Sequence, residues 1–140
     1  MTWIKQAIDF GVIALLVLMS ILSLAIFLER WTFTRKLDLS AFKHRKELEL
    51  ALTARLNWIA IIASNAPYIG LLGTVLGIML TFSLMGQDGQ MDSTRIMSGL
   101  ALALKATAAG LLTAIPASAL YNLLLRRMKV LLMRWEIQHG

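Results

Sequence analysis

Residues 58–85 read WIAIIASNAPYIGLLGTVLGIMLTFSLM and contain no Asp, Glu, Lys or Arg. An α-helix rises about 1.5 Å per residue, so about 20 apolar residues cross the hydrocarbon core of a bilayer, which is about 30 Å thick. Backbone polar groups inside lipid have no water to bind, and a helix pairs them internally. Residues 58–85 are therefore predicted to form a transmembrane helix.

Two further apolar stretches flank this one. Residues 10–28 carry no charged side chain, and residues 96–125 carry only Lys105. The whole chain has 140 residues, of which 58% are hydrophobic and 16% charged, whereas about 25% of a typical soluble domain is charged. These features predict an all-α membrane protein with three transmembrane helices and helical cytoplasmic extensions.

The net charge of +6 is concentrated at two places. The basic residues between the first two spans are Arg30, Arg35, Lys36, Lys43, Arg45, Lys46 and Arg55, and those after the third span are Arg126, Arg127, Lys129 and Arg134. Basic segments stay in the cytoplasm, which places the N-terminus outside and the C-terminus inside. This orientation accounts for the charge without a nucleic-acid partner.

The apolar stretches and the distribution of charge together divide the chain into seven predicted segments. These are a short outer interfacial segment (1–9), the first span (10–28), a cytoplasmic helical extension and turn (29–57), the second span (58–85), an outer loop (86–95), the third span (96–125) and a cytoplasmic tail (126–140). Asp92 and Ser93 compete to cap the third helix. The first span lacks a stripe of small residues, so we expect it to contact lipid at the periphery.

Residue types needed for several kinds of chemistry are missing. The chain has no cysteine, and its two histidines, His44 and His139, are isolated, so no metal-ligand pattern is present. Phosphate-binding glycine loops, zinc-protease motifs and dinucleotide fingerprints are also absent. We therefore expect neither a metal nor a cofactor, and no catalytic residues of an enzyme.

The second and third spans each carry a face of small and hydroxyl-bearing residues. In the second span this face holds Gly70, Thr74, Gly77 and Thr81, and in the third it holds Ala103, Thr107, Gly110, Ala114, Ala117 and Tyr121. Small residues let membrane helices pack closely, while threonine hydroxyls either bond their own backbone or line a water-filled passage. Periodicity alone leaves both interpretations open.

Three other residues inside the spans require an explanation. Pro116 and Pro67 are expected to kink the third and second helices, because proline removes a backbone hydrogen bond. Lys105 is the one charge within a span, and such residues are functional candidates. Snorkelling towards the outer surface or a contact between subunits is favoured over ion conduction, since Lys105 lies 200° from Thr107 at about 100° per residue.

Carboxylates are absent from residues 58–85 and 96–125. A proton relay through a membrane needs a group that titrates. If protons cross the membrane here, the carboxyl group must come from another polypeptide.

Two sequence runs resemble the paired signatures of the MotA/TolQ/ExbB proton-channel family. Residues 66–79, APYIGLLGTVLGIM, are similar to its second-span signature. Residues 106–117, ATAAGLLTAIPA, closed by Tyr121 and Asn122, are similar to its third-span signature. The short chain, without a large cytoplasmic domain, resembles the compact ExbB type within that family.

The resemblance implies an assembly in a bacterial inner membrane driven by the proton motive force. It implies a homopentamer around ExbD-like single-span partners that supply the pore aspartate, and a TonB-like protein that carries the work to outer-membrane transporters. Thr74 and Thr107 match the family's pore-facing threonines, and the small faces that carry them add Gly70, Gly77, Thr81, Gly110 and Ala114 as predicted pore-lining residues. Many family members carry a glutamate five residues before the third-span threonine, whereas this chain has Leu102, so that glutamate's relay role does not transfer.

Three alternatives remain open from the sequence. A TolQ-like motor subunit for envelope integrity would share both signatures. A non-conducting membrane scaffold would use the small faces only for packing. A secondary transporter is disfavoured, because the sequence has neither internal repeats nor paired broken helices.

Overall fold

The computed structural model describes residues 2–89 and 92–139. Its elements are α1 (Thr2–Arg35), a short 3₁₀ helix η1 (Leu39–Ala41), α2 (Arg45–Thr53), α3 (Leu56–Asp88) and α4 (Ser93–His139). No strand occurs in the described residues, which confirms the all-α class. Residues 1, 90, 91 and 140, at the chain ends and in the predicted outer loop, lie outside the described part.

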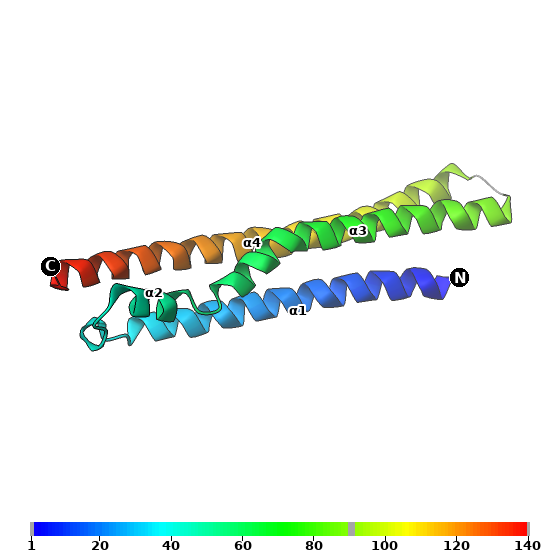
Figure 1. Cartoon of the computed structure of the whole chain (residues 1–140). Helices are drawn as coiled ribbons and strands as arrows, with labels where there is room; N and C mark the ends of the chain where they lie inside the picture. The colour runs from blue at the N-terminus through cyan, green and yellow to red at the C-terminus, as the bar shows by residue number, and fades with distance from the viewer. Residues whose placement is uncertain (1, 90–91, 140) are drawn as a thin grey trace.

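Three long helices dominate the arrangement (Figure 1). α3 and α4 run antiparallel along one another, α1 lies beside them, and α2 with η1 packs near the C-terminal end of α4. α1, α3 and α4 are each long and apolar enough to cross a membrane. This confirms three membrane-spanning helices, while the exact membrane boundaries stay a prediction.

The helices extend beyond the predicted spans. α1 runs without interruption for 34 residues, so the predicted outer segment forms its first turns and does not make a separate element. α4 has 47 residues and includes nearly all of the predicted tail. Leu16 and Ile26 are buried on the inner side of α1, whereas Leu18 and Ile21 are each 61% exposed. One face of α1 is therefore apolar and exposed in the single chain, and its contact with lipid stays a prediction.

The segment between the first two spans is more divided than the sequence indicated. A break at Ala54 and Arg55 separates α2 from α3, and Arg55 adopts the left-handed conformation with φ 66°. Few residues other than glycine adopt this conformation. An ion pair of 2.9 Å between Arg55 and Glu29 joins the break to α1. No glycine or proline marks the position, so turn chemistry does not reveal it.

α2 is held against the C-terminal half of α4 by an apolar cluster. Leu48 and Leu52, one turn apart, are buried against Leu131 and Leu132. Such burial contributes about 1.5–3 kcal/mol per leucine side chain. The Trp135 indole also donates a 3.0 Å hydrogen bond to the Phe42 carbonyl oxygen.

Arg30 connects α1 to α2 in the same region. Its Nη2 donates a 2.7 Å hydrogen bond to the Ala51 carbonyl oxygen, and its guanidinium lies 4.3 Å from the centre of the Phe33 ring. Burial lowers the pKa of Arg30 from its usual value, and the nearby Glu29 carboxylate partly offsets this effect. A buried charge held in this way fixes how the C-terminal end of α1 meets α2.

The helix ends at the opposite end of the molecule follow ordinary capping rules. Gly89 ends α3 at φ 69°, and its N–H donates to the Met85 carbonyl oxygen over 3.0 Å. Asp92 caps α4, because its carboxylate accepts a 3.1 Å hydrogen bond from the Thr94 N–H. Of the two residues considered from the sequence, Asp92 therefore acts as the cap.

Both prolines lie inside uninterrupted helices. In Figure 1 the first turns of α3 lie at an angle to the rest of that helix. The assignment of this bend to Pro67, and of a kink to Pro116, stays a prediction.

Candidate functional site

α3 and α4 come into close backbone contact at Gly70 and Gly110. A Cβ atom added to Gly110 would lie 2.7 Å from the Ala66 carbonyl oxygen and 3.0 Å from the Gly70 Cα. A Cβ atom added to Gly70 would lie 2.6 Å from the Ala106 carbonyl oxygen. Real Cβ atoms essentially never come this close to backbone atoms. The two helices therefore touch backbone to backbone, in the manner of small-residue contacts in membranes.

The other small residues of the predicted pore face also lie along this contact. A Cβ atom on Gly77 would lie 3.1 Å from that of Ala103, and Thr81 faces Gly99. Ala114 is 6% exposed and packs among Leu16, Ala66 and their neighbours. Five of the predicted pore-lining residues are buried within the single chain, where they pack the helices against one another. They are Gly70, Gly77, Thr81, Gly110 and Ala114. Their lining of a pore in an assembly stays a prediction.

Thr74 and Thr107 form the polar centre of the α3–α4 contact. The Thr74 hydroxyl donates a 2.9 Å hydrogen bond to the Ala103 carbonyl oxygen, and it also lies 3.3 Å from the Gly70 carbonyl oxygen. The hydroxyls of Thr74 and Thr107 are hydrogen-bonded to one another. A hydroxyl has one proton to donate. When Thr74 donates to Ala103, Thr107 is the donor to Thr74.

Thr107 differs from Thr74 in its exposure. Thr74 is 6% exposed, whereas Thr107 is half-buried at the edge of the contact. A hydroxyl oxygen that has donated its proton retains lone pairs that accept hydrogen bonds. Thr107 therefore presents an oriented acceptor towards any group that approaches the edge, such as a protonated carboxyl group or a water molecule.

Neighbouring threonines lack this arrangement. Thr81 donates a 2.8 Å hydrogen bond to the Gly77 carbonyl oxygen of its own helix. Thr113 donates a 3.0 Å bond to Ala109 one turn earlier and accepts a 3.3 Å bond from Ser20 of α1. These two hydroxyls are satisfied by ordinary helix back-bonding and a contact to α1. The pair of Thr74 and Thr107 is thus distinct among the described threonines of α3 and α4.

Thr74 and Thr107 both lie in the part of the chain that matches a known protein family. Residues 24–137 match the model of the MotA/TolQ/ExbB proton channel family. The chain belongs to this family. Together with the three apolar helices, membership makes it a multi-pass protein of the inner membrane.

Relatives within the MotA/TolQ/ExbB family cover nearly the whole chain. A biopolymer transport protein ExbB of Aquifex aeolicus is 51% identical over 137 residues, which are 98% of this chain and 93% of the relative. A putative ExbB-like 2 protein of Helicobacter pylori is 50% identical over 135 residues, or 96% of this chain and 90% of the relative. A Tol-Pal system protein TolQ of Pseudomonas aeruginosa is 41% identical over 87 residues, which are 62% of this chain and 38% of the relative.

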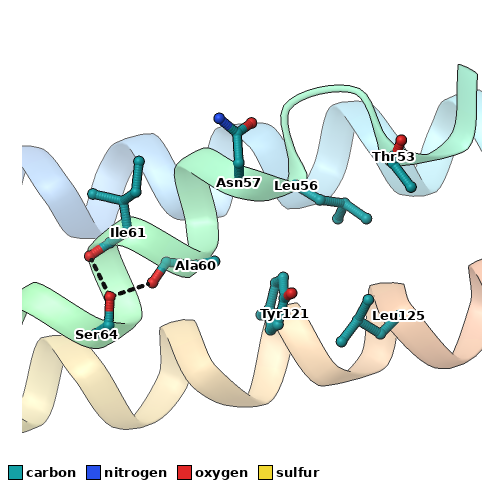
Figure 2. A pocket seen from close by; sticks show the side chains of 8 residues that line it. All are labelled: Thr53, Leu56, Asn57, Ala60, Ile61, Ser64, Tyr121 and Leu125. Carbon is teal, nitrogen blue, oxygen red and sulfur yellow. Dashed lines mark hydrogen bonds between the residues drawn. The ribbon is translucent and has the colours of Figure 1, made fainter. Parts of the chain in front are cut away.

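A cavity of about 570 Å³ lies at the cytoplasmic end of the α3–α4 contact, in the predicted orientation of this family member. Figure 2 shows Tyr121 and Leu125 of α4 across from Leu56 and Ala60 in the first turns of α3. The side chains that line it are Thr53, Leu56, Asn57, Ala60, Ile61, Ser64, Tyr121 and Leu125. Four of these carry hydroxyl or amide groups, so the cavity suits water.

Lys105 lies on another face of α4. Together with Gln6, Asp9 and Phe10 of α1, it lines a groove of about 280 Å³. Thr107 instead contacts α3, so the two residues serve different surfaces of the same helix. Leu102, at the position where many family members carry a glutamate, lines the groove with Lys105.

Asp9 is the functional candidate that the sequence analysis missed. The sequence analysis considered carboxylates only within the second and third spans. Asp9 directly precedes the first span and was not singled out. Asp9 lines the same groove as Lys105, the one cation of the third span. The signal was the topology: the first and third spans are predicted to run in the same direction, with Asp9 directly before the first span and Lys105 in the outer third of the third span.

Proposed function

We propose that this chain is the ExbB-like subunit of an inner-membrane motor driven by the proton motive force. In this proposal an ExbD-like single-span partner supplies a carboxyl group, and a TonB-like protein delivers the work to transporters of the outer membrane. The chain assembles as a pentamer, with Thr107 facing the space that the partner occupies. The N-terminus is periplasmic and the C-terminus cytoplasmic.

The observation that carries the proposal is the hydroxyl pair of Thr74 and Thr107. It joins the two helices that bear the family signatures, and Thr107, the half-buried member of the pair, can accept a hydrogen bond at the edge of the contact. Support also comes from the ExbB relatives, which match over almost the full chain. The lack of carboxylates in residues 58–85 and 96–125 supports a titrating group that comes from a partner.

The division of labour between the subunits follows from this chemistry. The partner's carboxyl group binds a proton from the periplasmic side and loses its charge, so it enters the apolar wall at low cost. Its O–H then donates to the Thr107 hydroxyl, while the small residues behind keep α3 and α4 fixed. Release of the proton towards the water-accessible cavity near Tyr121 restores the charge. In this proposal each proton that is bound and released moves the partner relative to the α3–α4 faces of the surrounding subunits.

A TolQ-like role is the second candidate, favoured by the 41% identity to TolQ of Pseudomonas aeruginosa. That match spans 38% of the relative, whereas the ExbB of Aquifex aeolicus matches over 93% of its length. The difference in coverage favours the ExbB-like role. Complementation separates the two, because an ExbB-like subunit restores energised uptake and a TolQ-like subunit restores envelope integrity.

Proton flux is the direct test of the motor. The chain is purified with its single-span partner, reconstituted into liposomes, and assayed with an interior pH dye under an imposed potential. Thr107→Val keeps the shape of the side chain and removes the acceptor, so we expect flux and uptake to fall by at least tenfold. Thr113→Val is the matched control on the same helix, since Thr113 is held by Ala109 and Ser20.

Two results would contradict the proposal. If Thr107→Val conducts as well as Thr113→Val, the hydroxyl pair takes no part in proton transfer. If no partner with an intramembrane carboxyl group co-purifies and the complex passes no protons, the non-conducting scaffold is the correct function.

A further inference from the structure

A groove with three arginines lies between the C-terminal end of α1 and the C-terminal half of α4. It encloses about 240 Å³ and is lined by Trp31, Leu123, Arg126, Arg127, Val130, Leu131 and Arg134. Four of the lining residues are apolar or aromatic, and the other three are arginines. Arg127 and Arg134 are seven residues apart, so they lie on one face of the helix, about 10 Å apart along its axis.

These arginines lack the carboxylate partners that others nearby possess. Arg30 and Arg55 pair with Glu29, and Arg45 pairs with both Glu49 and Glu136. Within residues 2–89 and 92–139, none of the three groove arginines forms an ion pair with a carboxylate. Their positive charge is therefore available to a ligand that comes from outside the chain.

Arg127 is already oriented before any ligand binds. Its Nε donates a 2.6 Å hydrogen bond to the Thr34 hydroxyl, and its guanidinium lies 4.5 Å from the centre of the Trp31 ring. The terminal nitrogens keep their donors, which suit the oxygens of a phosphate. Pre-orientation reduces the side-chain entropy lost on binding.

The groove begins where the apolar part of α4 ends. Arg126 directly follows residues 96–125, the predicted third span, and Trp31 is a residue type typical of the membrane–water interface. This depth matches the phosphate level of a lipid, with its acyl chains beside the apolar residues below. Basic pockets beside transmembrane helices bind anionic headgroups for this reason.

We propose that this groove is a binding site for the headgroup of an anionic phospholipid. The phosphate binds Arg127 and Arg126, and Arg134 adds attraction from the aqueous side. Trp31 and Leu123 contact the upper part of the acyl chains. The site rests on the membrane-spanning fold and not on the motor, so it can be tested without a partner or proton flux.

Native mass spectrometry of the full-length protein measures this binding directly. The protein is stripped of lipid in a neutral detergent and titrated with dioctanoyl phosphatidylglycerol, dioctanoyl phosphatidylcholine or inorganic phosphate. The test variant is the double substitution Arg126→Gln and Arg134→Gln, which keeps the contacts of Arg127 to α1. The control variant carries Lys129→Gln and Arg35→Gln, two exposed basic residues outside the groove.

We expect phosphatidylglycerol to bind more tightly than phosphatidylcholine, and the test variant to weaken this binding by about 30-fold. The control variant should bind phosphatidylglycerol as the natural sequence does. Equal weakening in both variants would overturn the proposal, because binding would then depend on total charge. If inorganic phosphate binds as tightly as phosphatidylglycerol, the acyl chains contribute nothing to binding. The groove would then be a free-phosphate site, and the lipid proposal would be overturned.

A second measurement guards against misfolding of the variant. Trp31 is kept as the single tryptophan by replacing Trp3, Trp58 and Trp135 with Phe, and brominated lipids serve as contact quenchers. Brominated phosphatidylglycerol should quench Trp31 more strongly than brominated phosphatidylcholine. If the test variant instead loses its oligomeric state while its lipid binding is unchanged, an acidic segment of another subunit occupies the groove and the lipid proposal is wrong.

Discussion

Replacing Gly110 with alanine probes the backbone contact on which the threonine pair depends. The new Cβ atom would lie 2.7 Å from the Ala66 carbonyl oxygen, and ordinary contact begins at 3.4 Å. The helices must therefore separate by about 0.7 Å at this point. A separation of that size would stretch the hydrogen bond from Thr74 to Ala103, now 2.9 Å, to about 3.6 Å, which is too long for a hydrogen bond.

The expected cost has two parts. Overpacking of this kind destabilises a protein by about 1–3 kcal/mol, and loss of a hydrogen bond between membrane helices costs about 0.6 kcal/mol on average. Unfolding of the purified protein by sodium dodecyl sulfate, followed by circular dichroism, measures the sum. Proton flux with the partner should fall together with stability, since Thr107 loses its fixed orientation.

Gly86→Ala is the matched control for this substitution. Gly86 lies in α3, is exposed, and has nothing within 4 Å of an added Cβ atom. Alanine there should stabilise the helix by about 0.5–1 kcal/mol, because glycine loses more backbone entropy. The reasoning is refuted if Gly110→Ala is as stable as Gly86→Ala, since the two backbones could not then be in contact.

Three further substitutions test other parts of the structure. Leu48→Ala should destabilise the packing of α2 against α4 by about 2–5 kcal/mol, seen as faster proteolysis there, whereas Leu50→Ala should have little effect, since Leu50 is 73% exposed and Leu48 fully buried. Thr74→Val should lower the free energy of unfolding by about 0.6 kcal/mol, less than Gly110→Ala; an equal loss would contradict the ranking. Asp9 and Lys105 line one groove, and if their opposite charges interact there, Asp9→Asn should destabilise the protein and adding Lys105→Leu should restore stability; additive losses in the double variant would show that the groove does not couple the two charges.

The long helices could be predicted because lipid imposes a simple rule on sequence. Residues 10–28, 58–85 and 96–125 exclude charge with one exception, and each belongs to a helix long enough to span. The small faces were also visible, since spacing places Gly70 with Thr74 and Thr107 with Gly110. Their direction was open, because a glycine that faces a neighbouring helix and one that faces a pore give the same pattern.

Other features depend on three-dimensional neighbours that a sequence does not display. The break at Arg55 carries neither glycine nor proline, and its left-handed conformation coincides with a charge pair to Glu29 on another helix. Asp9 lies 96 positions from Lys105 in the chain numbering, yet both line one groove. The arginine groove likewise needs α1 and α4 side by side before its residues belong together.

The mutual contact of Gly70 and Gly110 also limits how the chain can change. Each glycine occupies the space that a side chain on the other helix would need, and neither residue can be made smaller. A harmful substitution at one position therefore has no remedy at the other. Suppressors of Gly110→Ala are expected at positions that let α3 and α4 tilt apart, such as the turn at Gly89. Selection for such suppressors would identify the positions at which the packing of these two helices can change.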